Sequence, residues 1–287
     1  MAIYGVLVLA LIVVYFILSV VSRNKYDDFI TEMNGQYSLL FMAPVSLYIM
    51  NKWLIMERFH TQVSNIQQKM IGLHGSREAL KHTRMFIAQL ISIVLVCFLG
   101  SFLIALLSSG DHVMFLAGCI FTFIIPVIMI NQLSNKEKDR KNKILLELPE
   151  LVNKIILLVN AGETVQQAIV RCVEMKGEND SPLYAELKVT VNKLTSNEPF
   201  GHVMNEFSKK CGIQEVSLFT TTVLLNYRKG GQDLIISLRE LSTVLWEKRK
   251  SISRTKGEEA SSKLVFPLIL IFIAMMIIVG YPAISIL

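Results

Sequence analysis

Charge is missing from four long stretches of this 287-residue chain. The uncharged and mainly apolar stretches are residues 2–21, 86–107, 113–133 and 264–287. A helix needs about 20 predominantly apolar residues to cross the hydrocarbon core of a bilayer. The composition is 52% hydrophobic, with a mean hydropathy of +0.48, which excludes an ordinary soluble protein. The sequence therefore predicts an integral membrane protein with about four transmembrane helices, at residues 1–21, 86–107, 113–133 and 264–287.

Catalytic and metal-binding motifs are also missing. The chain has no phosphate-binding P-loop, no HExxH zinc motif and no GxSxG nucleophile motif. Its four cysteines form no CxxC pair, and its five histidines are scattered without ligand spacing. We therefore expect no catalytic residues, no metal and no cofactor, and we expect that the protein is not an enzyme.

The net charge of +6 has two interpretations. A basic protein can bind nucleic acid, but the chain has no zinc-finger spacing and no basic stripe interleaved with aromatic residues. Membrane proteins carry an excess of Lys and Arg in their cytoplasmic segments, and this bias explains the charge more simply. The expected partner is the lipid bilayer, and no nucleic acid is expected.

The distribution of Lys and Arg predicts the orientation in the membrane. Basic residues are concentrated in segments 22–85, 135–143 and 248–263, whereas the connector 108–112 has neither Lys nor Arg. The expected protein is thus a multi-pass protein of the cytoplasmic (plasma) membrane. Segment 22–85 and the main domain, 134–263, are expected in the cytosol, and both ends of the chain are expected outside.

Segment 37–53 complicates this topology, because it is apolar and has Pro44 in its middle. Its uncharged run, Gly35 to Asn51, is on the short side for a span. If it crossed the membrane, the basic residues between it and the next span would fall outside, against the charge rule. We favour an interfacial or buried helix near 37–53 within a helical segment 22–85, and the crossing alternative stays open.

Between residues 134 and 263 the apolar residues recur with the period of an α-helix, and no strand-like alternation is present. Helix stops and starts divide the segment into six helices, of which the first runs from about 144 to 160. Gly162 suits the left-handed position that ends a helix, and Gly230 and Gly231 form a stop followed by a restart. Short turns make neighbouring helices antiparallel. The predicted fold is all-α, with a cytoplasmic six-helix antiparallel bundle.

The predicted spans contain almost no ionisable residues. Intramembrane charges usually mark ion pathways, so their scarcity weakens a transporter or channel interpretation. The second span instead shows small residues at Cys97, Ser101 and Ala105, which lie on one helical face. Such faces let helices pack closely in lipid.

Several short motifs resemble those of one known family. These motifs are LLELPE at 145–150, LLVNAG at 157–162, NEPFG at 197–201, RKGG at 228–231, LREL at 238–241, EEASSKLVFP at 258–267 and GYPA at 280–283. They resemble the F domain of type II secretion systems, and most of all the TadC-type branch found in tight-adherence (Tad) pilus systems. The resemblance covers about residues 144–287, and it places a turn at Gly201.

The resemblance implies a non-enzymatic platform protein that couples a cytoplasmic hexameric ATPase to the insertion or extraction of pilin subunits. Because the chain has one copy of the helical domain, it implies pairing with a second, TadB-like platform protein or with itself. The rival hypothesis is a membrane transporter or channel subunit with a cytoplasmic regulatory bundle. We expect the turns and charged helix ends to form the partner contact surface, with these residues: Glu147, Glu150, Arg228, Lys229, Arg239 and Glu240.

Overall fold

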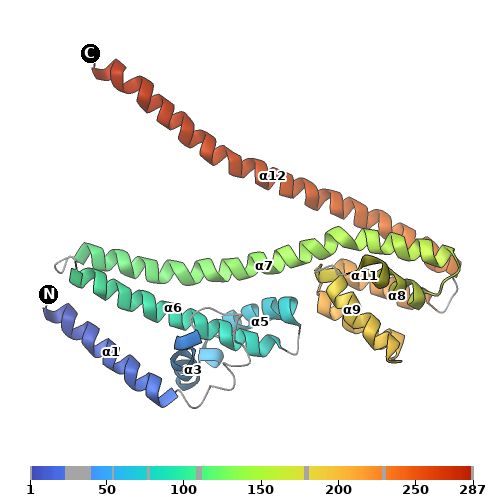
Figure 1. Ribbon diagram of the computed structural model, residues 1–287, viewed down its shortest axis with the longest axis horizontal. Helices are drawn as coiled ribbons and strands as arrows, with labels where there is room; N and C mark the ends of the chain where they lie inside the picture. Colours follow the sequence, from blue (N-terminus) through green and yellow to red (C-terminus); the bar gives the residue numbers. More distant parts are fainter. Residues whose placement is uncertain are drawn as a thin grey trace. The chain divides into compact units, whose positions relative to one another are not determined.

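The computed structural model describes residues 2–22, 40–53, 55–75, 78–107, 112–177, 181–227 and 231–285. These residues form eleven α-helices and one short 3-10 helix, so the all-α prediction is confirmed (Figure 1). The chain divides into two compact units, residues 1–140 and 141–287. Each unit is described by itself.

The first unit contains the N-terminal helices. They are α1 (Ala2–Ser22), η2 (Leu40–Met42), α3 (Ala43–Lys52), α4 (Ile55–Arg58), α5 (His60–His74), α6 (Ala79–Leu107) and the first part of α7 (His112–Asn160). Helix α6 packs against α5, α3 and α1. One apolar cluster joins α3, α5, α6 and α7 and includes Leu47, Met70, Phe86 and Leu133. A hydrogen bond also connects α7 to α5: the Arg140 guanidinium donates to the carbonyl oxygen of Gly72, near the end of α5, at 2.7 Å.

Among the described residues, three helices are long and apolar enough to cross a membrane. They are α6, α7 and α12 (Gly231–Ser285), and they contain the predicted spans at 86–107 and 113–133 and residues 264–285 of the predicted last span. The predicted first span coincides with α1, an uncharged helix of 21 residues, and its crossing stays a prediction. In α12 the apolar part is fully unpacked within the described residues, because every side chain from Leu264 to Ile278 is exposed.

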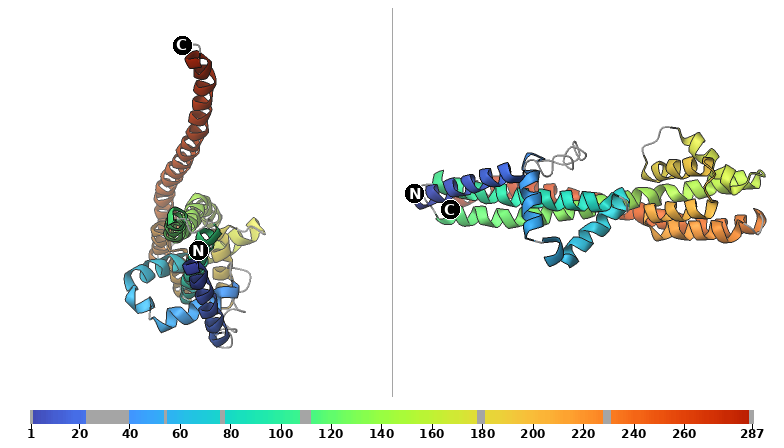
Figure 2. Two further views of the ribbon diagram at one scale, coloured as in Figure 1. Left: turned by 90° about the vertical axis from the view of Figure 1, so that its left-hand side faces the viewer. Right: turned by 90° about the horizontal axis from the view of Figure 1, so that it is seen from below.

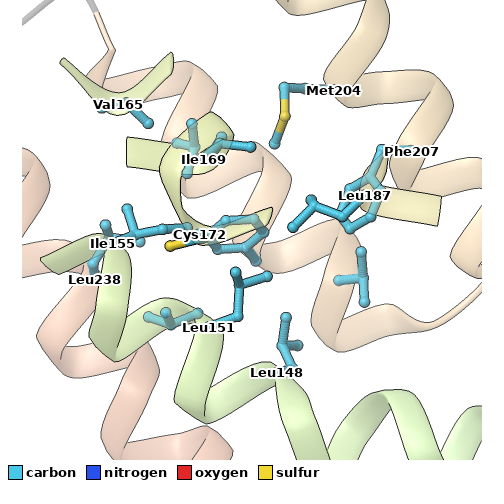
Figure 3. Packing of buried hydrophobic residues seen from close by; sticks show 14 of the residues in the cluster. Leu148, Leu151, Ile155, Val165, Ile169, Cys172, Leu187, Met204, Phe207 and Leu238 are labelled. Atoms are coloured by element: carbon cyan, nitrogen blue, oxygen red, sulfur yellow. The ribbon is translucent and has the colours of Figure 1, made fainter. Parts of the chain in front are cut away.

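The second unit is a helical bundle. Its helices are the end of α7, α8 (Val165–Lys176), α9 (Pro182–Thr195), α10 (Phe200–Cys211), α11 (Gln214–Asn226) and the first part of α12. All of them contribute to a single core, in which Leu148, Leu151, Ile155, Cys172 and Leu238 are completely buried (Figure 3). Burying a side chain of this size stabilises a fold by about 1.5–3 kcal/mol, so this shared core is what holds the helices together.

Two helices of the bundle end in the same way. After α7 the amide of Gly162 donates to the carbonyl of Val159, and the amide of Glu163 donates to the carbonyl of Leu158. This pair of bonds is a Schellman motif, and Gly162 has the positive φ of 98° that the motif requires. After α9 the same two bonds form around Asn197, which has φ 61°.

The turn between α9 and α10 therefore differs from the one implied by the resemblance. Its left-handed residue is Asn197, whereas Gly201 lies in the first turn of α10 without a positive φ. A Cβ on Gly201 would meet only Leu224, at an ordinary 3.9 Å. Nothing in the local backbone requires glycine at 201, so the turn depends on Asn197.

The beginnings of α8 and α9 are fixed by side-chain caps. The Thr164 hydroxyl accepts from the amide of Gln167, and the Gln167 side chain accepts from the amide of Thr164, which makes a capping box. Ser181 caps α9, with Pro182 at its first position. These caps satisfy amides that the helix itself leaves unpaired.

Helices α7 and α12 are both continuous, and for α7 the sequence predicts two separate elements. Helix α7 has 49 residues and joins the span at 113–133 to the bundle helix expected from about 144. Helix α12 has 55 residues and joins the last bundle helix to the last span. At 1.5 Å per residue they are about 74 Å and 83 Å long. Both α7, which leads into the bundle, and α12, which leads out of it, thus connect the bundle to an apolar, charge-free stretch of helix without an intervening loop.

Candidate interaction surface of the helical bundle

Glu147 and Glu150 lie on α7 and are both tied to other parts of the bundle. The Ser181 hydroxyl, at the start of α9, donates a hydrogen bond to a carboxylate oxygen of Glu147. The Lys154 ammonium donates to Glu150 at 2.9 Å, as expected from their spacing of four residues. This bond is the main reason why the pKa of Glu150 is below its usual value, and the charges of Lys154, Lys176 and Arg249 lower it further. Glu150 is therefore an ionised carboxylate that faces basic residues from three helices.

Arg239 and Glu240 lie elsewhere on the bundle. Both are exposed on α12, one turn before Ser242, whose hydroxyl donates a 2.6 Å hydrogen bond to the Asn153 side chain of α7. Glu150 precedes Asn153 by three residues, and Arg239 precedes Ser242 by three residues. Because α7 and α12 are antiparallel here, Glu150 and Arg239 lie on opposite sides of this hydrogen bond along the bundle. Their levels along the bundle therefore differ by about 9 Å, at 1.5 Å per residue. The structure does not gather the four residues into one cluster.

Three other predicted residues, Arg228, Lys229 and Gly230, lie outside the described residues. Gly231 is the first residue of α12. The antiparallel pairing through Asn153 and Ser242 places the start of α12 at the same end of the bundle as the turn at Gly162. This is the end opposite to the continuations of α7 and α12 into their apolar stretches, and we call it the distal end.

A shallow polar hollow at the distal end was not predicted from the sequence. It is lined by these residues of the α7–α8 turn and of α8: Glu163, Thr164, Gln166, Gln167, Val170, Arg171 and Glu174. Arg171 forms an ion pair with one oxygen of Glu163, and the other oxygen of Glu163 is buried without a hydrogen-bond partner in the described part of the chain. A carboxylate oxygen in this state can accept a further donor. In the sequence, the only local sign of this hollow is the acidic residue Glu163, directly before the Thr164 cap.

A second feature missed by the sequence analysis is apolar. Helices α11 and α12 are held together by Glu215 with Lys248 at 3.2 Å and by Asn226 with Ser237 at 3.4 Å. Their outer sides carry large exposed apolar side chains: Leu218, Leu225, Ile236 and Val244. Exposed apolar side chains in such numbers are compatible with a contact to another protein.

One group of side chains among the described residues has donor atoms close enough to hold a metal ion. Glu198, His202 and Glu206 have ligand atoms within 4.8 Å of one another at the start of α10. Glu206, however, is hydrogen-bonded to Lys193 and lies 3.9 Å from Lys210. The Lys193 bond is also the largest reason why the pKa of Glu206 is lowered. The geometry is that of an ion-paired surface cluster, and His202 is exposed.

The small residues of the second predicted span lie on the packed side of α6. Ser101 and Ala105 are buried, and Cys97 is partly exposed. Ser101 meets Gly118 of α7 so closely that a Cβ on Gly118 would be 2.5 Å from the Ser101 Cβ. The rings of Phe102 in α6 and Phe115 in α7 also contact each other in a tilted arrangement, with ring centres 4.9 Å apart.

The fold defines an all-α protein in which three helices are long and apolar enough to cross a membrane. Comparison of the chain with protein-family models, with characterised proteins and with solved structures finds no match.

Proposed function

We propose that this chain is a non-enzymatic platform protein of the cytoplasmic membrane, which couples a hexameric ATPase to the movement of pilin subunits during secretion or pilus assembly. The observation that carries the proposal is the continuity of α7 and α12 from the bundle into apolar, charge-free helix. A displacement of the bundle is then transmitted along two hydrogen-bonded helices, with no loop to absorb it. The motifs that resemble the F domain add the identity of the partners.

The distal end is the surface that we assign to the ATPase. It combines the polar hollow around Glu163 with the start of α12, which follows the predicted contact residues Arg228 and Lys229 in the sequence. A cytoplasmic motor approaches a membrane-attached bundle from the end farthest from its membrane helices. We assign the exposed apolar side chains of α11 and α12 to the second platform protein, or to a second copy of this chain.

The ATPase contact is tested by co-purification with the secretion ATPase encoded beside this chain. The detergent-solubilised chain should retain the ATPase, and the double variant Arg228→Glu with Lys229→Glu should lose it at an unchanged membrane level. A matched control, Lys209→Glu with Lys250→Glu, makes the same change of charge at two exposed positions outside the distal end and should retain binding.

The rival function, a transporter or channel, predicts the opposite pattern. In liposomes the chain would then conduct a solute, and it would bind no secretion ATPase. That combination of results would contradict the platform proposal. Retained binding in the double variant, with normal pilus assembly, would instead remove Arg228 and Lys229 from the contact surface while leaving the rest of the proposal in place.

A further inference from the structure

The first unit contains a short helix, α3, at the level where the uncharged stretch of α6 begins and that of α7 ends. Phe86 is the first residue of the uncharged stretch in α6, and Leu133 is the last one in α7; both belong to the apolar cluster of this unit. Helix α3 contributes Leu47 and Met50 to the same cluster. Helix α3 therefore lies beside the ends of these two stretches.

A buried hydrogen bond shows more closely where α3 lies along α6. The Ser92 hydroxyl of α6 donates to the Ser46 hydroxyl of α3 at 3.1 Å, and both side chains are almost completely buried. Ser92 lies six residues past Phe86, which is about 9 Å into the uncharged stretch. The Ser46 hydroxyl also donates to the Ala43 carbonyl at 3.0 Å, so this contact satisfies its polar groups without water.

The length and direction of α3 fit a position along the membrane surface. With ten residues it is about 15 Å long, half of the roughly 30 Å that a crossing helix must span. In the right-hand view of Figure 2, α3 (blue, near residue 45) runs across the direction of α1 and α6.

The side chains that α3 and its neighbours expose have the composition of a membrane interface. Phe41, Trp53 and Phe59 have exposed fractions of 81%, 69% and 50%. The Lys52 ammonium lies 5.9 Å from the centre of the Tyr48 ring. Tryptophan and tyrosine are enriched at the headgroup level of bilayers, and lysine extends its ammonium toward the water there.

We propose that residues 41–53 and 55–59 form an in-plane anchor, whose Phe41, Trp53 and Phe59 rings insert into the headgroup region of the bilayer. The lipid surface is the occupant of these exposed aromatic side chains. The inference rests on the proposed membrane position of α6 and α7, and it is independent of the proposed ATPase and pilin partners.

Trp53 is itself the probe for this proposal, because the chain has only one other tryptophan, Trp246. The Trp246→Phe variant of the full chain is reconstituted into vesicles of phosphatidylcholine and phosphatidylglycerol. The phosphatidylcholine carries bromine atoms on either the upper or the lower part of its acyl chains. We expect the upper bromines to remove most of the Trp53 fluorescence, the lower bromines less and aqueous iodide least. The emission should also shift to the blue on transfer from detergent-free denaturant to vesicles.

The matched control is Trp53→Phe, which leaves Trp246 on the bundle. Trp246 is 43% exposed and lies against Arg249, with 4.8 Å between the guanidinium and the ring centre. It should respond to iodide and to neither brominated lipid.

Three results would overturn the proposal. Dominant quenching of Trp53 by iodide would place the segment in water, and dominant quenching by the lower bromines would mean that the segment crosses the membrane. Protection from all three quenchers would mean that a protein covers the face. Loss of ATPase binding with an intact pattern of lipid quenching would refute only the proposed function, so the two failures are distinguishable.

Discussion

The close contact between Gly118 of α7 and Ser101 of α6 predicts the effect of the substitution Gly118→Ala. A methyl group at Gly118 would lie 2.5 Å from the Cβ of Ser101 and 2.9 Å from its Cα. Carbon atoms in contact prefer about 3.5–4.0 Å, so α6 and α7 would have to separate by about 1 Å. The backbone atom at 2.9 Å leaves no rotamer change that could relieve the contact.

The expected cost follows from two opposing effects. Overpacking of a well-packed contact typically costs about 1–3 kcal/mol. Alanine is favoured over glycine inside a helix by about 1 kcal/mol, which offsets part of this cost. Gly100→Ala is the matched control, because Gly100 likewise lies inside a helix, α6, and a Cβ there would have no atom within 4 Å. Gly118→Ala should therefore be less stable than Gly100→Ala by about 1–3 kcal/mol.

The assay uses the chain's own cysteines as local reporters. The purified chain is heated in detergent with a thiol reagent, and mass spectrometry locates the label. In Gly118→Ala, Cys97 and Cys119 should react at a lower temperature than in Gly100→Ala, because they lie on the separating helices. Cys172 and Cys211 are buried in the bundle and should react as before. Ser101→Gly removes one of the two contacts and should partly restore Gly118→Ala.

Equal labelling of Cys97 and Cys119 in the two alanine variants would refute the reasoning. It would mean that the contact between Ser101 and Gly118 relaxes without cost. Early labelling of all four cysteines would refute it in another way, because the effect would not be confined to α6 and α7.

The remaining predictions concern the bundle. Gly162→Ala should destabilise the bundle by about 1 kcal/mol, because φ at this position is 98°. Asn197→Gly should stabilise the bundle by a few tenths to about 1 kcal/mol, because φ at Asn197 is also positive, at 61°. Chemical denaturation followed by circular dichroism measures both changes. Burial raises the pKa of Cys172 to about 11, so its alkylation at pH 8 should be slow until denaturant is added, and fast alkylation of the native chain would show that the thiol is accessible. The pKa of Glu150 is lowered by the hydrogen bond from Lys154, so its stabilisation is present above pH 4.5 and is lost as the pH falls through the folded-state pKa. Glu150→Gln should therefore lose less stability than the parent between neutral and acidic pH, and parallel pH profiles would contradict this.

The features that were predictable from the sequence are the local ones. The absence of charge from 86–107, 113–133 and 264–287 identifies three helices because the hydrocarbon core excludes charge along every such stretch. Gly162 was assigned correctly because a left-handed residue after an apolar stripe has few alternatives. Asn197 was missed in favour of Gly201 because asparagine adopts positive φ less often than glycine, and only the backbone shows that it does so here.

The features that were not predictable depend on the tertiary arrangement. The sequence cannot place Glu150 against Arg249, because the two residues meet only after α7 and α12 pair. The continuity of α7 was also hidden, since the change from apolar to charged residues near Ser134 resembles a domain boundary although the backbone hydrogen bonds continue through it. The hollow beside Glu163 combines a turn with α8, and neither part contains a motif on its own.

The boundary between the two units falls within α7, at residues 140 and 141, so the chain passes from one unit to the next as unbroken helix. Each residue of an α-helix adds about 100° of rotation and 1.5 Å of length. One residue inserted between Asn135 and Lys143 would turn the following part of α7 by more than a quarter of a revolution, whereas seven inserted residues would return it close to its original direction. Substitutions at the exposed positions of this stretch should thus be tolerated far better than single insertions or deletions, and the linker is constrained by its length more than by its chemistry.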